Sequence, residues 1–403
     1  MWRELLRENV TTAEELIEPL KLTNEEYEEI RDETEQFPMS VTRYYLSLID
    51  PDDPEDPIRK MAIPAGRTVL TDGVLDTSGE HSNTKLQGMQ HKYRETVMVL
   101  TTPVCAMFCR HCFRRRLVGK ETGETAVDKD AIIGYIKDHP EVTNVLLSGG
   151  DSFMLSTEAI AGWLDRLSGL DQLDFIRFGT RTIVTFPQRI TMDPELVKVL
   201  GEYSKKKQIY VVTHFNHPKE ITPESMAAVK ALQGAGVVIK NQTVLMKGIN
   251  DDKDVLTTLL KKVSSLGIVQ HYIFQCRPVQ GVRSRFQVPI ARGSRLVSEA
   301  LACQNGLGKS ADYAMSHVTG KMRILGETGD GRMLFQYKQA KDRSNLGRIV
   351  AVKLGEDQTW LDDDFETVHM GSRHLESTGV RHRERHEAGI LNRTLAPLGS
   401  RSV

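Results

Sequence analysis

The chain has 403 residues, of which 39% are hydrophobic and 27% are charged, and its 53 Lys and Arg residues are balanced by 54 Asp and Glu residues, for a formal net charge of −1. This composition is globular and excludes a mainly disordered or collagen-like chain, and no stretch reaches the roughly 18 consecutive apolar residues of a membrane helix. Balanced charge argues against a whole-molecule field that would attract nucleic acid, so we expect a cytoplasmic protein with one large core.

Residues 1–90 are predicted to form a helical N-terminal region. Two Thr-x-x-Glu segments fit capping boxes, in which a Thr oxygen accepts an early helix N–H and the Glu side chain reaches back: residues 12–15 and 23–26. Residues 39–49 fit a further helix. The four prolines and several acids of residues 51–64 indicate a linker or an extended strap.

Residues 91–305 alternate short apolar runs with helix-patterned segments. The six predicted strands are residues 97–101, 144–148, 175–179, 209–214, 237–244 and 268–275. The six predicted helices lie near residues 129–138, 156–167, 193–204, 223–234, 253–266 and 292–303. Strands that are apolar along their whole length imply a parallel sheet covered by helices. Because a closed barrel needs eight such units, we predict an α/β fold with an incomplete (β/α)6 barrel, open on one side, whose active site lies at the C-terminal ends of its strands.

Residues 306–368 are predicted to form a small C-terminal β extension. Residues 322–326 and 333–337 flank a glycine-rich turn and fit a hairpin, and residues 349–354 fit another strand. From residue 369 to 403 the chain is rich in Arg, His, Ser and Gly with little apolar period, which predicts a flexible tail.

Three of the five cysteines, Cys105, Cys109 and Cys112, lie within the sequence CAMFCRHC, directly after the first predicted barrel strand. Three thiolates on one loop can hold three corners of a [4Fe–4S] cluster, which leaves one iron open. An open iron can chelate the amino and carboxylate groups of S-adenosyl-L-methionine (SAM), and electron transfer to SAM then gives a 5′-deoxyadenosyl radical. Zinc is the alternative, but it usually takes four ligands in paired spacings, and no second pair is present. The spacing therefore favours the cluster.

Several motifs resemble the lysine 2,3-aminomutase family of radical SAM enzymes. They are CAMFCRHCFRRR at residues 105–116, LLSGGD at 146–151, PQRI at 187–190, THFNHP at 213–218 and NQTVLMKGIND at 241–251. Residues 44–64 (YYLSLIDPDDPEDPIRKMAIP) are similar too, so the resemblance runs from about residue 40 to residue 280.

This resemblance implies a radical SAM barrel, a [4Fe–4S] cluster, SAM and pyridoxal 5′-phosphate (PLP). It also implies an isomerase that moves an amino group between the α and β carbons of a PLP-bound amino acid, after the adenosyl radical removes a β-hydrogen. The implied partners are the amino acid substrate and an electron donor such as flavodoxin or ferredoxin. By the same analogy, the N-terminal region could pack on a second copy of the chain.

For SAM, the resemblance implies two groups of residues. Gly149, Gly150 and Asp151 end the second strand, where the family binds the methionine amino group, and His214 and Gln242 match positions near the nucleoside. The plainer alternatives are a simple turn for Gly-Gly-Asp and a hydrogen-bonded strand-end position for the histidine.

For PLP, Lys92 and Tyr93 match the phosphate-contacting stretch of the family, with Lys in place of Arg, and a second expected arginine is Thr96 here. The catalytic lysine of the family follows a glycine run after the barrel, and its nearest equivalent is Lys321, which only one glycine precedes. Lys309, which also follows a glycine, is a rival. A lysine after a glycine is commonly only a turn residue.

For the substrate, Arg114 occupies the position, two after the third cysteine, that the family uses to bind a carboxylate. The alternative is that Arg114 belongs to a solvated or RNA-facing basic patch. The lysine enzymes have an acid directly after the Gln-Cys of the sixth strand, where this chain has Arg277, and the second acid of that pair has no counterpart at residues 314–317. A cation repels a second ammonium group and attracts a carboxylate or phosphate. We therefore predict an acidic substrate such as glutamate, unless Arg277 turns outward and pairs with a surface acid.

Three other functions stay open at this point. The first is a lysine 2,3-aminomutase proper. The second is a radical SAM enzyme that modifies RNA or protein without PLP, which the arginine run and the basic segment at residues 381–386 favour slightly. The third is a zinc-binding interaction module without catalysis.

Overall fold

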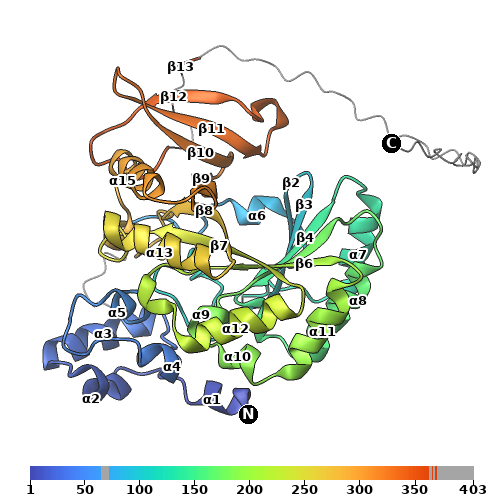
Figure 1. The fold of residues 1–403 in the computed structure, drawn as a ribbon, viewed down its shortest axis with the longest axis horizontal. Helices are drawn as coiled ribbons and strands as arrows, with labels where there is room; N and C mark the ends of the chain where they lie inside the picture. The colour runs from blue at the N-terminus through green and yellow to red at the C-terminus, as the bar shows by residue number, and fades with distance from the viewer. Residues whose placement is uncertain (65–71, 121, 363–364, 366–367, 370–403) are drawn as a thin grey trace, which may run out of the picture.

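The computed structural model describes the chain except for residues 65–71, 121, 363–364, 366–367 and 370–403. Within the described part, thirteen strands form one open sheet in which every strand pairs with its neighbours in sequence (Figure 1). The predicted flexible tail lies outside the described residues, apart from His369, which ends β13 (Val368–His369).

The centre of the sheet is the predicted set of six parallel strands. They are β3 (Thr96–Thr102), β4 (Asn144–Gly149), β5 (Phe175–Gly179), β6 (Gln208–Thr213), β7 (Val238–Leu245) and β8 (Val269–Gln275). The connecting helices are α7 (Lys129–Asp138), α8 (Thr157–Ser168), α11 (Pro194–Ser204), α12 (Pro223–Gly234), α13 (Lys253–Ser265) and α15 (Ile290–Ala302). Short helices stand between some of these: α9 (Thr182–Thr185), α10 (Gln188–Thr191) and α14 (Arg283–Phe286). The incomplete (β/α)6 barrel is therefore confirmed, and its sheet does not close.

The sheet extends beyond this barrel at both edges. At one edge, β1 (Thr84–Leu86) and β2 (Met89–Tyr93) form an antiparallel hairpin on β3 that the sequence did not predict. At the other edge, β9 (Asp312–His317) is an unpredicted seventh parallel strand, paired with β8. The predicted hairpin is confirmed as β10 (Gly320–Glu327) and β11 (Arg332–Ala340), followed by β12 (Ile349–Lys353). Residue 91 lies within β2, and the strands on either side of residue 306, β8 and β9, belong to the same sheet. The domain boundaries at residues 91 and 306 therefore stay predictions.

The N-terminal region is mainly helical: its part up to residue 62 lies at one side of the barrel, whereas the helix Glu80–Asn83 lies beside β2 (Figure 1). Its helices are α1 (Trp2–Arg7), α2 (Ile17–Leu20), α3 (Asn24–Gln36), α4 (Arg43–Leu46), α5 (Pro57–Ala62) and α6 (Glu80–Asn83). Thr23 and Glu26 form the predicted capping box of α3. The predicted box at residues 12–15 does not form: Glu15 accepts the N–H groups of Thr11 and Thr12, but the Thr12 side chain caps no helix. None of the helices in the described ranges is both long and apolar enough to cross a bilayer.

The interpretation of residues 51–64 as a linker or extended strap is wrong, because they contain α5. Asp56 caps this helix by accepting the N–H groups of Ile58 and Arg59, and Pro57 occupies its first position. A proline is well suited to that position, since it lacks an N–H that would have no partner there. The predicted helix at residues 39–49 is shorter, and only α4 forms.

Candidate active site

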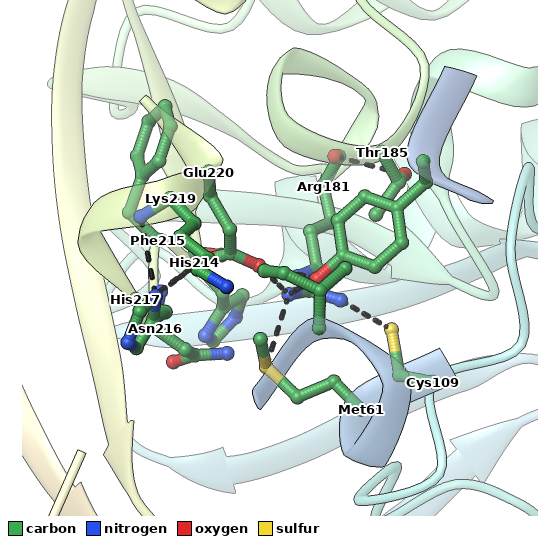
Figure 2. Close-up of polar contacts among 12 residues, drawn as sticks. Met61, Cys109, Arg181, Thr185, His214, Phe215, Asn216, His217, Lys219 and Glu220 are labelled. Carbon is green, nitrogen blue, oxygen red and sulfur yellow. Dashed lines mark hydrogen bonds and ion pairs between the residues drawn. The ribbon is translucent and has the colours of Figure 1, made fainter. Parts of the chain in front are cut away.

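The three clustered cysteines lie on a loop that directly follows β3, and all three are half-buried. The Cys109 sulfur accepts a hydrogen bond from Nη1 of Arg181 at 2.8 Å (Figure 2), and the Cys112 sulfur accepts the backbone N–H of Arg114 at 3.3 Å. Burial raises the pKa of Cys112 to about 11 and that of Cys105 well above its ordinary value. A metal that binds these thiols must therefore displace their protons.

The N-terminal region holds this cysteine loop in place. The backbone N–H of Phe108 donates to the Ser40 carbonyl at 2.9 Å, and the N–H of Arg110 donates to the Met61 carbonyl at 2.9 Å. The guanidinium of Arg110 pairs with Glu33 of α3, and both side chains are buried. The loop is thus fixed by backbone contacts and by one buried ion pair.

Within the part of the chain that the structure describes, no three His, Cys, Asp or Glu side chains are arranged to hold a single metal ion. A cubane cluster presents its irons at separate corners, so its thiolate ligands need not meet at one point. The loop with its three thiols fits this requirement.

Gly149 and Gly150 allow the end of β4 to approach the chain that leads into the cysteine loop. Gly149 has φ +121°, and a Cβ atom there would lie 2.4 Å from the Thr102 carbonyl oxygen. A Cβ atom on Gly150 would lie 2.5 Å from the Val104 oxygen, and the Gly150 N–H donates to Thr102. Only glycine fits at both positions, so these residues have a packing role beside their predicted role at SAM.

Asp151 is buried, and both of its carboxylate oxygens accept backbone hydrogen bonds. The donors are the N–H of Phe153 at 3.0 Å and the N–H of Arg181 at 2.7 Å. Burial raises the pKa of this carboxyl group. A ligand ammonium would therefore meet a carboxylate that is already fixed in position by the ends of β4 and β5.

A cavity near these residues has a volume of about 280 Å³ and is lined mainly by residues of the sheet. Alternate residues of four strands contribute, as expected for one face of a pleated sheet: Thr96 and Met98, Leu146 and Ser148, Arg177 and Gly179, Gln242 and Val244. Seven predicted site residues line it together: Lys92, Tyr93, Arg114, His214, Gln242, Arg277 and Lys321. The three clustered cysteines, Gly149, Gly150 and Asp151 lie outside this lining.

The cavity has a large excess of positive charge. Its lining contains five Lys and Arg side chains: Lys92, Arg114, Arg177, Arg277 and Lys321. Among the described lining residues, Glu80 of α6 is the one carboxylate. Glu80 pairs with Arg114 at 2.9 Å and with Arg116 at 2.7 Å, and these partners lower its pKa to about 2 against the opposing effect of burial. The cavity is therefore suited to an anionic ligand.

Arg114 already has protein partners. Besides Glu80, its guanidinium donates from Nη1 to Ser148 at 2.9 Å and contacts the Met98 sulfur from Nη2 at 2.8 Å. A substrate carboxylate at Arg114 must therefore share the guanidinium with Glu80. The sequence predicted Arg114 as a carboxylate-binding residue but did not predict its buried ion pair with Glu80.

Arg277 turns into the cavity and not toward the surface. Its guanidinium carbon lies 4.3 Å from the centre of the Phe113 ring, and its buried Nη1 has no hydrogen-bond partner. Three further cavity-lining residues have a buried polar atom without a partner: Ser78, His111 and Arg177. Buried polar groups are seldom left unpaired, so these four atoms point to a polar ligand in the cavity.

Lys321 lies in the cavity, whereas its rival Lys309 is exposed on a short 3₁₀ turn. The ammonium of Lys321 lies 4.5 Å from the centre of the Tyr272 ring. Burial and the neighbouring cations lower its pKa to about 7. A half-buried amine that is readily neutral suits attachment to an aldehyde.

Lys92 and Tyr93 are the last two residues of β2, and both line the cavity. The Lys92 ammonium donates to the carbonyl of His317 at 2.9 Å, and burial lowers its pKa to about 8. At the position of the expected second arginine, Thr96 bonds to Asn144. Arg177 also donates to Asn144, at 2.6 Å. The positive charge of Arg177 therefore lies close to Thr96, the position where the family has its second arginine.

His214, which directly follows β6, lies next to Gln242 in the middle of β7. The Nδ1 of His214 lies 2.6 Å from the Gln242 carbonyl oxygen, and burial lowers the imidazole pKa to about 4. The ring is thus a neutral hydrogen-bonding group that lines the cavity.

Sequence reasoning missed three residues of this region: Glu80, Arg177 and Arg181. Arg177 could have been found, because an arginine in the middle of a predicted buried strand needs a partner. Glu80 could not, since nothing in its helical neighbourhood indicates that it meets Arg114, 34 residues away.

The chain matches the Radical SAM superfamily over residues 99–259. It is 38% identical over 350 residues to a putative L-lysine 2,3-aminomutase of Aquifex aeolicus, which covers 86% of this chain and 93% of the relative. It is also 38% identical over 299 residues to the L-lysine 2,3-aminomutase of Clostridium subterminale, with 73% of this chain and 70% of the relative covered.

A glutamate 2,3-aminomutase of Clostridioides difficile is 37% identical over 281 residues, with 69% of this chain and 65% of the relative covered. The identities to the lysine and glutamate enzymes are nearly the same. Overall similarity therefore does not separate the two substrates, and the side chains of the cavity must be considered.

Proposed function

This chain belongs to the lysine 2,3-aminomutase family of radical SAM enzymes, and from that membership we propose that it is a PLP-dependent isomerase that moves the α-amino group of an acidic amino acid to the β carbon. Membership of the superfamily implies a [4Fe–4S] cluster and SAM. The observation that carries the choice of substrate is the half-buried Arg277, whose Nη1 atom is buried without a hydrogen-bond partner in a cavity where cations exceed carboxylates.

The residues present fit the proposed cofactors. When bound, the cluster with SAM supplies a hydrogen-abstracting radical, and PLP supplies an aldehyde for the substrate amino group. Cys105, Cys109 and Cys112 would hold the cluster, and the segments ending in Asp151 and His214 would hold SAM beside it. Lys321 would hold the aldehyde of PLP.

The phosphate group of PLP carries negative charge and needs cationic side chains in addition to the lysine that holds the aldehyde. Lys92 and Tyr93 are the proposed contacts, and Arg177 supports the same place, because it shares Asn144 with Thr96. A dianionic phosphate would offset much of the positive charge of the cavity.

The substrate would be oriented by its two carboxylates. Arg114 is the proposed partner of the α-carboxylate, and Arg277 of the side-chain carboxylate. The second ammonium group of lysine would instead meet Arg277, with Glu80 already paired to Arg114 and Arg116. Two positive charges placed side by side in the cavity disfavour binding, so lysine should be a poor substrate.

The test is a product analysis with anaerobically reconstituted protein, reductant and SAM. Glutamate, aspartate and lysine are supplied separately, with and without PLP, and β-amino acids are identified by mass spectrometry. We expect β-glutamate in the presence of PLP and little β-lysine. Rapid formation of β-lysine would contradict the substrate assignment, and activity that is independent of PLP would contradict the cofactor.

The enzyme also needs an electron for its cluster. A flavodoxin or ferredoxin is the proposed donor, and a reduced cytoplasmic compartment suits both this donor and an oxygen-sensitive cluster. A radical SAM enzyme that modifies RNA or protein is the alternative, and it predicts that no β-amino acid forms from any free amino acid.

A further inference from the structure

Arg181 is a buried cation that joins the cysteine loop to the ends of three strands. It follows β5, and its Nη1 donates to the Cys109 sulfur at 2.8 Å while its Nε donates to the His214 carbonyl at 3.1 Å (Figure 2). Its backbone N–H donates to Asp151 at 2.7 Å. One residue thus contacts a proposed cluster ligand and both proposed SAM-binding segments.

A buried carboxylate fixes Arg181 from the other side. The Nη2 of Arg181 donates to Oε1 of Glu220 at 2.5 Å, and the hydroxyl of Tyr45 donates to the same oxygen at 2.6 Å. The second oxygen of Glu220 accepts the N–H groups of Asn216 and His217. Glu220 is completely buried, so this anion cannot turn away to solvent.

We infer that Arg181 is a positioning residue that raises the reduction potential of the cluster through Cys109. The inference rests on the assignment of the three cysteines to the cluster in the proposed function. Hydrogen bonds to cluster sulfurs and nearby charge set the potential of an iron–sulfur cluster. A guanidinium on a ligand sulfur stabilises the added electron of the reduced state, because the electron increases the negative charge at that sulfur.

Glu220 has the opposite effect on the potential. It places a negative charge behind the guanidinium, which partly offsets the field of Arg181 at the cluster. Removal of each charge should therefore move the potential in opposite directions. A merely structural role for the two residues would not produce this change of sign.

The test compares reconstituted wild-type protein with Arg181→Gln, Arg181→Lys and Glu220→Gln. Iron per chain is measured first, and the midpoint potential is then obtained from the EPR signal of the reduced cluster. Arg181→Gln should lower the ratio of reduced to oxidised cluster about tenfold at a fixed solution potential, which is about 59 mV for a one-electron couple. Arg181→Lys should lower it less, and Glu220→Gln should raise it.

Arg189→Gln is the matched control. Arg189 is also completely buried, but its guanidinium contacts Phe153 at 2.6 Å and Asp193 at 2.7 Å. Loss of this buried cation should leave the potential unchanged. An equal shift in Arg189→Gln and Arg181→Gln would overturn the inference.

Equal potentials in wild type and Arg181→Gln, with about four irons in each, would also overturn it. If Arg181→Gln is folded by circular dichroism but loses iron, the potentials of Arg181→Lys and Glu220→Gln decide: a lower potential in the first and a higher one in the second support the inference, and potentials equal to that of wild type refute it. Wild-type protein that binds no cluster would refute the cysteine assignment as well. The predicted shifts in a protein without aminomutase activity would leave the inference standing and remove the proposed function.

Discussion

At the scale of single residues, Arg277 should decide which amino acid the cavity accepts. Arg277→Gln removes the charge and should lower kcat/KM for an acidic substrate roughly 10–100-fold, since a hydrogen bond to a charged group contributes about 1.5–3 kcal/mol. Steady-state assays on glutamate and lysine check this. Arg277→Lys, which keeps the charge, is the control and should lose less. Unchanged selectivity in Arg277→Gln would exclude Arg277 from substrate binding.

Lys321 should make PLP binding depend on pH. Its pKa is lowered to about 7, so the neutral amine that can react with an aldehyde is scarce below pH 7 and becomes dominant above it. The charged or titratable groups that face it are Lys92, Arg177, Arg277 and Lys338, with His271 and Tyr272 on β8. The association rate of PLP, followed by absorbance, should therefore rise through pH 7 and level off.

Lys321→Ala should abolish the absorbance of lysine-bound PLP at every pH. Lys309→Ala is the matched control, because Lys309 is exposed and lies outside the cavity. Loss of the band in Lys309→Ala, with retention in Lys321→Ala, would reverse the assignment of the two lysines.

At the scale of elements, Gly320 determines how closely β10 and β11 approach. A Cβ atom at Gly320 would lie 2.3 Å from the Gln339 carbonyl oxygen, so Gly320→Ala forces the hairpin apart next to Lys321. We expect a loss of about 1–3 kcal/mol in the free energy of unfolding, typical of overpacking, together with weaker PLP binding. Urea denaturation measures the first effect.

Gly329→Ala is the control for this hairpin. A Cβ atom at Gly329 would have nothing within 4 Å, so this variant should unfold at the same urea concentration as wild type. Equal stability of both variants would show that the close approach at Gly320 costs nothing.

The sequence predicted the repeating elements well, because each parallel strand is a short run of mainly apolar residues and each helix has one apolar face. The prediction failed where a strand was too short to show a pattern, or where one pattern fits two kinds of structure. The β1–β2 hairpin is only a few residues per strand, β9 mixes polar and apolar residues along one run, and Pro57 suggested a linker where it begins a helix. In the site, motifs indicated the cysteines and Lys321, but pairings such as Glu80 with Arg114 depend on tertiary contacts that no local spacing reveals.

At the scale of the whole molecule, the pair between Glu33 and Arg110 connects the N-terminal region to the cysteine loop. Both side chains are buried, and Glu33 also lies 3.6 Å from Arg115. Glu33→Gln leaves buried cations without their counter-charge, which typically costs 3–5 kcal/mol. We expect this loss in urea unfolding, accompanied by a lower iron content after reconstitution.

Glu28→Gln on the same helix is the control for that variant. Glu28 forms an exposed pair with Arg31, and exposed pairs contribute about 0–1 kcal/mol. Equal effects of the two substitutions would mean that the buried pair does not anchor the loop.

The strictly sequential order of the strands has a consequence for biosynthesis. Each strand of the sheet from β2 to β13 pairs with the strand that precedes it in the chain. As the polypeptide leaves the ribosome from its N-terminus, every new strand finds an edge that is already formed, and no earlier edge must wait for a distant partner. Nascent chains arrested after β5 or β8 should thus already be resistant to proteases up to their last complete strand.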